Sequence, residues 1–101
     1  MKRPLTAILS ARAQQEIEEA RAWWVEHRHT PELDDSIAAA LDRLEQFPEI
    51  APRVKSGGRW TTTRRYILDG VGYHLYYRFD AHTQTLFVRS LWHERRRKPR
   101  L

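Results

Sequence analysis

Apolar positions in the first third of the chain recur at helical spacing after a short apolar run. Residues 5–9 form that run and predict an initial β-strand. Ser10 follows and is placed to cap a helix, because its hydroxyl can accept a hydrogen bond from a free backbone N–H of the first turn. The apolar face of this predicted helix consists of Ala13, Ile17, Ala20 and Trp24. We expect the helix to end near residues 27–29.

A second helix is predicted to begin at Thr30 and Pro31. Thr30 can cap it, and Pro31 suits the first turn, where a missing backbone N–H leaves no hydrogen bond unmade. Acidic residues follow at once and favour the positive end of the helix dipole. Its apolar stripe consists of Leu33, Ile37, Ala40, Leu41, Leu44 and Phe47, and Pro48 ends it. Two such helices form an antiparallel hairpin that needs another surface to cover its apolar faces.

The second half of the chain has the period of β-strands. Residues 52–58 are basic and glycine-rich and are predicted to form a loop. Three runs rich in β-formers, residues 60–68, 73–80 and 85–92, predict strands, and their short connections require antiparallel hairpins. We therefore expect an α+β fold in the order β-α-α-β-β-β, with the helical hairpin on one face of a small, mainly antiparallel sheet. At 101 residues the chain is one domain, residues 1–101, with a basic tail at 93–101.

Strand alternation assigns side chains to the two faces of this sheet. In residues 73–80 one set is expected to point to the helices and the other away: Leu75, Tyr77 and Phe79 against His74, Tyr76 and Arg78. In residues 85–92 the two sets are Leu86, Val88 and Ser90 against Phe87, Arg89 and Leu91, and Arg89 is assigned to the open face. Arg64 and Arg65 are neighbours, so one of them joins it. Arginine forks on such a face match phosphate or carboxylate oxygens.

Charge divides the chain into two halves. Residues 1–50 carry six Lys/Arg against ten Asp/Glu, a net of −4, whereas residues 51–101 carry twelve against three, a net of +9. Like charges gathered in one region repel each other, so this distribution indicates a polyanionic partner: RNA, DNA or an acidic protein segment. The chain has no cysteine, which excludes disulfides, thiolate nucleophiles and Cys-based zinc sites. No apolar run approaches the ~20 residues that span a bilayer, and we expect a cytoplasmic protein without a membrane partner.

Three segments of the second half resemble the C-terminal signature of the RelE/ParE toxin superfamily. They are the strand Arg65-Tyr66-Ile67-Leu68, the strand Gly72-Tyr73-His74-Leu75-Tyr76-Tyr77-Arg78-Phe79-Asp80, and the ending Leu91-Trp92-His93-Glu94-Arg95-Arg96. The first half is similar too, with its short strand, the aromatic pair Trp23-Trp24, and a helix ending in Leu44-x-x-Phe47-Pro48. The resemblance covers nearly the whole chain and lies in the order and spacing of these motifs.

This resemblance implies the toxic half of a bacterial type II toxin–antitoxin pair, with two mechanisms open. RelE-like members cut messenger RNA on the ribosome; Arg65, Arg78 or Arg89 would then neutralise phosphoryl charge while His93 protonates the leaving oxygen. ParE-like members inhibit DNA gyrase and lack the nuclease residues. RelE-like enzymes usually end in a tyrosine or a His-Tyr pair on the last strand, whereas no tyrosine follows Tyr77 here. The His-x-Arg-Arg ending is closer to ParE-like sequences, so we favour gyrase inhibition.

Binding residues and partners follow from this interpretation. A gyrase inhibitor would use the cations of the basic tail as its target-binding surface: Arg95, Arg96, Arg97, Lys98 and Arg100. The resemblance also implies a cognate antitoxin, for which Arg64 and Tyr76 are candidate contacts, and a toxin–antitoxin hetero-oligomer. An acidic, partly disordered antitoxin segment would pair with the basic half. A small basic nucleic-acid-binding module, suggested by composition alone, is the third class of function.

The aromatic residues and histidines also have structural interpretations. Trp23, Trp24, Tyr73 and Tyr77 are interpreted as core residues, because large aromatics supply much of the buried area of a small domain. A structural or exposed imidazole is the alternative role for His93. His27 and His29 are two residues apart at a helix end and do not face one another. We therefore expect neither a metal nor a cofactor.

Overall fold

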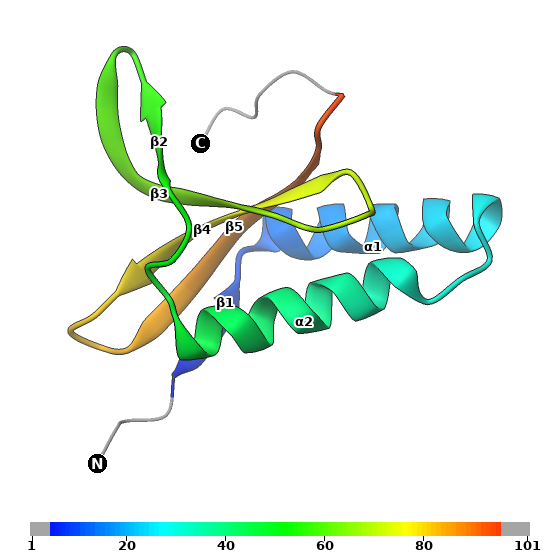
Figure 1. The fold of residues 1–101 in the computed structure, drawn as a ribbon, viewed down its shortest axis with the longest axis horizontal. Helices are drawn as coiled ribbons and strands as arrows, with labels where there is room; N and C mark the ends of the chain where they lie inside the picture. Colours follow the sequence, from blue (N-terminus) through cyan, green and yellow to red (C-terminus); the bar gives the residue numbers. More distant parts are fainter. Residues whose placement is uncertain (1–4, 96–101) are drawn as a thin grey trace.

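Two helices lie side by side on one face of a five-stranded sheet (Figure 1). The computed structural model describes residues 5–95. In chain order the elements are β1 (Thr6–Leu9), α1 (Ala11–His27), α2 (Glu32–Gln46), β2 (Arg53–Ser56), β3 (Arg59–Ile67), β4 (Tyr73–Asp80) and β5 (Thr85–His93). The sheet order is β1-β5-β4-β3-β2; β1 runs parallel to β5, and the other neighbours are antiparallel. The predicted α+β class is confirmed.

The two helices begin in different ways. Ser10 caps α1 as predicted, because its Oγ accepts a hydrogen bond from the Ala13 backbone N–H at 3.0 Å. The prediction that Thr30 caps α2 was wrong. Pro31 occupies the N-cap position of that helix without a side-chain bond, and the Thr30 hydroxyl instead accepts a hydrogen bond from the Trp24 indole N–H at 3.0 Å. Thr30 therefore fixes the end of α1 rather than the start of α2.

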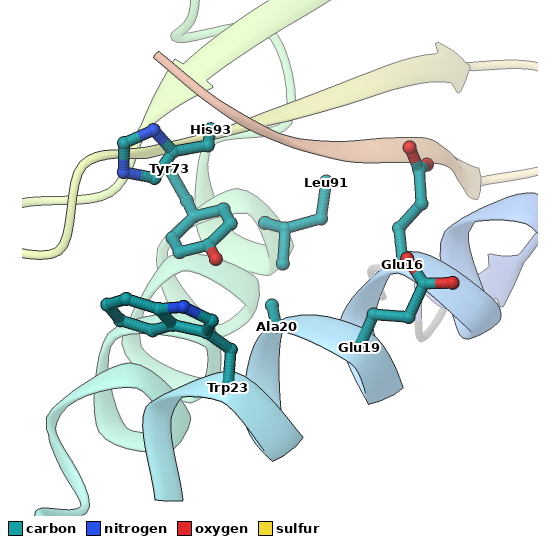
Figure 2. A pocket seen from close by; sticks show the side chains of 7 residues that line it. All are labelled: Glu16, Glu19, Ala20, Trp23, Tyr73, Leu91 and His93. Atoms are coloured by element: carbon teal, nitrogen blue, oxygen red, sulfur yellow. The ribbon is translucent and has the colours of Figure 1, made fainter. Parts of the chain in front are cut away.

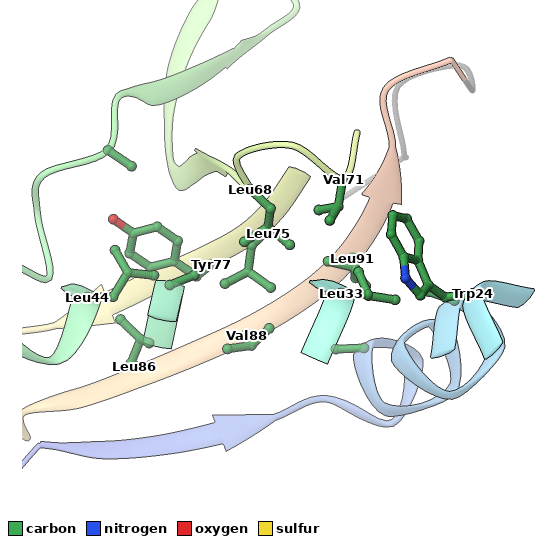
Figure 3. Packing of buried hydrophobic residues seen from close by; sticks show 14 residues of the cluster. Trp24, Leu33, Leu44, Leu68, Val71, Leu75, Tyr77, Leu86, Val88 and Leu91 are labelled. Atoms are coloured by element: carbon green, nitrogen blue, oxygen red, sulfur yellow. The ribbon is translucent and has the colours of Figure 1, made fainter. Parts of the chain in front are cut away.

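The core lies between the helices and the inner face of the sheet (Figure 3). Leu75 and Tyr77 of β4 are buried there with Trp24 and Leu44, and Phe79 is partly buried at the edge of the same cluster. Ile17 and Ile37 also pack against the cluster, as their helical spacing predicted. The predicted register of β4 is therefore confirmed. Within the part of the chain that the structure describes, no helix is long and apolar enough to cross a membrane.

A β-bulge changes the alternation in β5. Tyr77 pairs with Val88 but Tyr76 pairs with Ser90, so Arg89 is an extra residue on the β5 side. Beyond it Leu91 lies opposite Leu75 and is buried in the core. The predicted alternation, which grouped Leu91 with Phe87 and Arg89, therefore fails at Leu91, because a strict period of two does not survive an inserted residue.

The predicted loop at residues 52–58 is largely an edge strand. β2 pairs with β3, and Ser56 lies opposite Arg59 across a two-residue turn. Gly57 and Gly58 both have positive φ, at 58° and 76°, as the tight turns of β-hairpins require. The loop interpretation was wrong because the charged residues of β2 do not resemble a buried strand. The Gly-Gly pair between Ser56 and Arg59 was the available signal.

Candidate functional site

The outer face of the sheet holds a cavity of about 560 Å³ beneath the β2–β3 hairpin. Arg65 lies opposite Tyr76 in the β3–β4 register, and both line this cavity together with Arg89. Arg64 lies opposite Tyr77, whose side chain is in the core. Arg65 is therefore the arginine that faces the open side of the sheet. The hairpin supplies the rest of the lining: Pro52, Arg53, Val54, Lys55, Ser56, Trp60, Thr61, Thr62 and Thr63.

Two guanidinium groups line this cavity, and they differ in their hydrogen bonding. Nη1 of Arg89 donates a hydrogen bond to the buried Thr63 hydroxyl at 2.9 Å, which fixes the side chain that the bulge places there. Nε of Arg65 is buried without a hydrogen-bond partner among residues 5–95. A buried, unpaired donor is costly unless it finds an acceptor. The pair of arginines therefore suits a phosphate or carboxylate group entering the cavity.

Lys55 and Trp60 form the exposed rim of the same cavity. The Lys55 ammonium lies 4.6 Å from the centre of the Trp60 ring, and Trp60 is 64% exposed. The fold brings this rim over Tyr76, which is only 5% exposed. Tyr76 thus faces the cavity as its floor and not as a free surface.

Arg78 lies outside this cavity. It is exposed, and its guanidinium is 5.0 Å from the ring of Phe87, its cross-strand neighbour. It lines a separate hollow of about 310 Å³ near β1, to which Arg89 also contributes. Arg89 is therefore next to both hollows, whereas Arg65 and Arg78 line different ones.

His93 lies in a third place, at the end of β5 on the helix side. It pairs with Tyr73, and the two rings meet edge to face with their centres 5.0 Å apart. Its Nδ1 accepts a hydrogen bond from the Arg95 backbone N–H at 3.2 Å. The cavity that it lines is bounded by Glu16, Glu19, Ala20, Trp23, Tyr73, Leu91 and His93 (Figure 2). The four predicted catalytic residues are thus not gathered in one cavity.

His74 lies between the arginine cavity and the end of β5. Burial lowers the pKa of His74, and the positive charge of Arg65 lowers it further, while Glu94 opposes the shift. Nε2 of His74 is 3.8 Å from a carboxylate oxygen of Glu94. The neutral imidazole is therefore the favoured form beside Arg65.

Arg64 is bound to the connection between α2 and β2. Its Nη1 donates hydrogen bonds to the backbone carbonyls of Glu49 and Ala51, at 3.0 and 2.7 Å. Burial raises the pKa of the neighbouring Tyr77 phenol, and contacts with Ala51 and Arg64 oppose that rise. Arg64 thus anchors the chain where it enters the arginine cavity.

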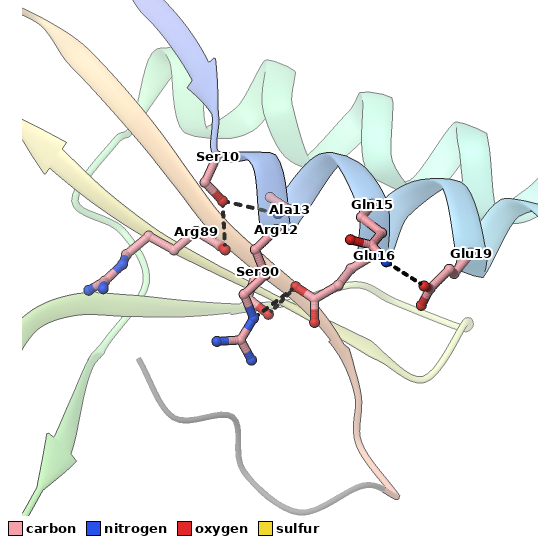
Figure 4. A network of polar contacts seen from close by, with 8 residues as sticks. All are labelled: Ser10, Arg12, Ala13, Gln15, Glu16, Glu19, Arg89 and Ser90. Carbon is pink, nitrogen blue, oxygen red and sulfur yellow. Dashed lines mark hydrogen bonds and ion pairs between the residues drawn. The ribbon is translucent and has the colours of Figure 1, made fainter.

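A polar network joins α1 to the bulged strand (Figure 4). The Ser10 hydroxyl donates a hydrogen bond to the Arg89 carbonyl at 3.0 Å, and the Ser90 hydroxyl donates one to Glu16 at 2.7 Å. Arg12 lies 3.5 Å from the same Glu16 oxygen. The network holds the start of α1 beside the backbone of β5 at the residue that carries a cavity arginine. Sequence spacing gave no signal for the two serine contacts, which join residues more than seventy positions apart.

The basic tail is described only at its start. Arg95 is exposed after the end of β5. Arg96, Arg97, Lys98 and Arg100, the other predicted target contacts, lie outside the described residues. The tail therefore stays a prediction. No group of His, Cys, Asp or Glu residues within 5–95 is arranged to hold a metal ion.

Comparison with known families covers nearly the whole chain. The sequence model of the ParE toxins of type II toxin–antitoxin systems, parDE, matches residues 7–98. The chain belongs to the ParE toxin family. It is therefore the toxin of a type II toxin–antitoxin system, which decides against the general nucleic-acid-binding module. No curated protein matches the sequence significantly.

Solved structures similar to this ParE-family chain support the fold. The RelBE2 toxin–antitoxin complex from Mycobacterium tuberculosis contains a chain with a TM-score of 0.65 at 17% identity, covering 90% of this chain and 99% of that one. A chain of the intact E. coli RelBE toxin–antitoxin complex has a TM-score of 0.65 at 18% identity, covering 91% of this chain and 99% of that one. A chain of the chromosomal ParDE system from P. aeruginosa has a TM-score of 0.62 at 7% identity, covering 89% of this chain and 96% of that one. At such identities the likeness establishes the RelE/ParE fold, as the resemblance implied.

Proposed function

We propose that this toxin acts by binding DNA gyrase, without chemistry of its own, and that a cognate antitoxin neutralises it. The observation that carries the proposal is the separation of His93 from the arginine cavity. A general acid must come within about 2.6–3.2 Å of the atom that it protonates. His93 lines a cavity on the helix side of the sheet, whereas Arg65 and Arg89 line one on the outer side. The match to the ParE family supports gyrase as the target.

One observation favours the nuclease alternative. Tyr76 lines the arginine cavity, so a phenol is present beside Arg65 and Arg89. A RelE-like ribonuclease would need such a proton donor next to cations that neutralise phosphoryl charge. Tyr76 is therefore the residue on which that mechanism would depend in this structure, in place of His93.

The antitoxin is proposed from the basic half of the chain and from the solved relatives, which are toxin–antitoxin complexes. An acidic segment would pair with the cations of this half, and apolar anchors would contribute most of the affinity. Arg64 and Tyr76 stay predicted contacts; Arg64 would meet the antitoxin while holding the carbonyls of Glu49 and Ala51. The result expected is an association rate that falls as the salt concentration rises. An association rate independent of salt would contradict the charge pairing.

The test compares the two mechanisms on one purified protein. Plasmid supercoiling by gyrase and transcript cleavage on translating ribosomes are measured with native toxin, Arg65→Ala, Tyr76→Phe, and a chain without residues 95–101. We expect the native toxin to inhibit supercoiling. The tail deletion should abolish this inhibition, because five cations are lost together, whereas Tyr76→Phe should retain it. Arg59→Gln, a single exposed cation on the β2–β3 hairpin, is the control for loss of charge. Transcript cleavage abolished by Tyr76→Phe, with supercoiling unaffected, would establish the ribonuclease.

A further inference from the structure

The cavity between α1 and the end of β5 combines aromatic walls with acidic groups (Figure 2). Its floor is formed by Ala20 and Leu91, both buried. Tyr73 lies above Trp23 on one side, and the carboxylates of Glu16 and Glu19 lie on the other. The volume of about 310 Å³ is roughly ten times the ~30 Å³ that one water molecule occupies in the liquid, so a side chain can enter.

Trp23 offers one ring face to this cavity. The interpretation of Trp23 as a core residue was wrong, because 44% of its surface is exposed. His27 covers part of the indole by stacking on it, with ring centres 4.4 Å apart and planes at 13°. The indole is therefore fixed in orientation while it lines an open cavity. An exposed, oriented indole face attracts a cation through the ring quadrupole.

The carboxylates supply the charge that such a cation needs. Glu19 lies one helical turn before Trp23 and is exposed. Glu16 is held by the Ser90 hydroxyl, and only 13% of its side chain is exposed. Arg12 shows the same chemistry beside the cavity: it lies 3.5 Å from Glu16 and 5.7 Å from the ring of Trp92. A guanidinium between a carboxylate and an indole is thus already one arrangement that this surface stabilises.

We propose that this cavity, hereafter the α1–β5 cavity, binds the side chain of an arginine or lysine that the antitoxin inserts. The inference rests on the proposed antitoxin pairing and deepens it. Residues 1–50 carry a net charge of −4 against +9 in the second half, so a segment that covers both needs acids for one and a cation for the other. The cation enters over Ala20 and Leu91, stacks on Trp23 and pairs with Glu19.

The first experiment tests the chemistry of the cavity without the antitoxin. The full chain is titrated with N-acetyl-arginine amide and with the matching citrulline amide, a neutral analogue of the same length, while the Trp23 indole resonance is followed by NMR. We expect a saturable shift with arginine only, abolished in Glu19→Gln and retained in Glu18→Gln. Glu18 is an exposed neighbour on α1 that does not line the cavity. Equal shifts with both compounds, or no saturable shift, would overturn the proposal.

The second experiment tests the antitoxin as the source. The affinity of the antitoxin encoded next to this gene is measured for Glu19→Gln and Trp23→Leu, with Glu18→Gln and Val25→Ala as controls, since both control residues are exposed on α1 and neither lines the cavity. Loss of an oriented cation contact predicts about tenfold weaker binding for the cavity variants and less than about twofold for the controls. Tight binding to the native toxin that cavity variants leave unchanged overturns this inference alone. An antitoxin that does not bind even the native chain overturns the proposed pairing, and this inference with it.

The chain's own tail is the competing occupant of the α1–β5 cavity, and the Trp23 indole resonance also tests this alternative. Deletion of residues 96–101 should leave the Trp23 signal of the free toxin unchanged if an external side chain fills the cavity. A shift of that signal on deletion, comparable with the shift caused by arginine, would assign the cavity to the tail and overturn the proposal.

Discussion

Arg64 offers a direct test of how the cavity entrance is held. Its guanidinium binds two backbone carbonyls after α2, so Arg64→Ala removes both hydrogen bonds at once. The bond to Ala51 is part-buried and the bond to Glu49 is exposed. Hydrogen bonds to a charged group contribute about 1.5–3 kcal/mol when buried and less at the surface. We expect the free energy of unfolding to fall by about 2 kcal/mol, which corresponds to a fall in Tm of about 8–16 °C in a domain of this size.

Urea unfolding followed by tryptophan fluorescence measures this loss. Arg64→Lys should lower the free energy of unfolding about half as much as Arg64→Ala, because an ammonium cannot match the geometry of the guanidinium. Arg59→Ala, at the exposed start of β3, is the control and should lie within about 0.5 kcal/mol of the native protein. A midpoint for Arg64→Ala equal to that of Arg59→Ala would refute the anchoring role. Arg64 would then be free for the predicted antitoxin contact.

Two further predictions concern the helix start and pH. Ser10→Ala should lower the free energy of unfolding by about 1–2 kcal/mol, because it removes the cap on Ala13 and the bond to the Arg89 carbonyl, and a thermal melt checks this. His74 has a lowered pKa, so the unfolded chain binds more protons below about pH 6.5, and unfolding free energy should fall as pH drops through that range. His74→Gln should reduce this loss of unfolding free energy between pH 7.5 and 5.5. His82→Gln, a change at an exposed histidine, is the control and should not reduce it. Identical pH dependences of the unfolding free energy in native protein and His74→Gln would show that His74 is not the group responsible.

Much of the fold was predictable because its signals are local. The cap at Ser10, the apolar spacing of α1, and the alternation of Leu75 and Tyr77 each need only neighbours in sequence. These signals specify the elements and their buried faces. The placement of the arginines on the outer face followed from them, apart from the choice between Arg64 and Arg65, which depended on the β3–β4 register.

The remaining features depend on contacts between distant segments. The bulge at Arg89 moves Leu91 into the core, and an inserted residue has no signature in the alternation that precedes it. The contact of Thr30 with Trp24 competes with its role as a cap, and only the packing of the helices decides between them. The separation of His93 from Arg65 has the same origin, since it depends on which face each strand end presents.

Inhibition of gyrase by native toxin and by His93→Ala tests the central claim most directly. Relaxed plasmid and purified gyrase are incubated with increasing toxin, and the concentration that halves supercoiling is compared between the two proteins. A binding mechanism predicts inhibition by both, within about fivefold, because one contact outside a hot spot contributes about 1 kcal/mol or less. The contradictory result is supercoiling unaffected by native toxin, together with transcript cleavage on ribosomes that Tyr76→Phe slows about 10²–10⁴-fold.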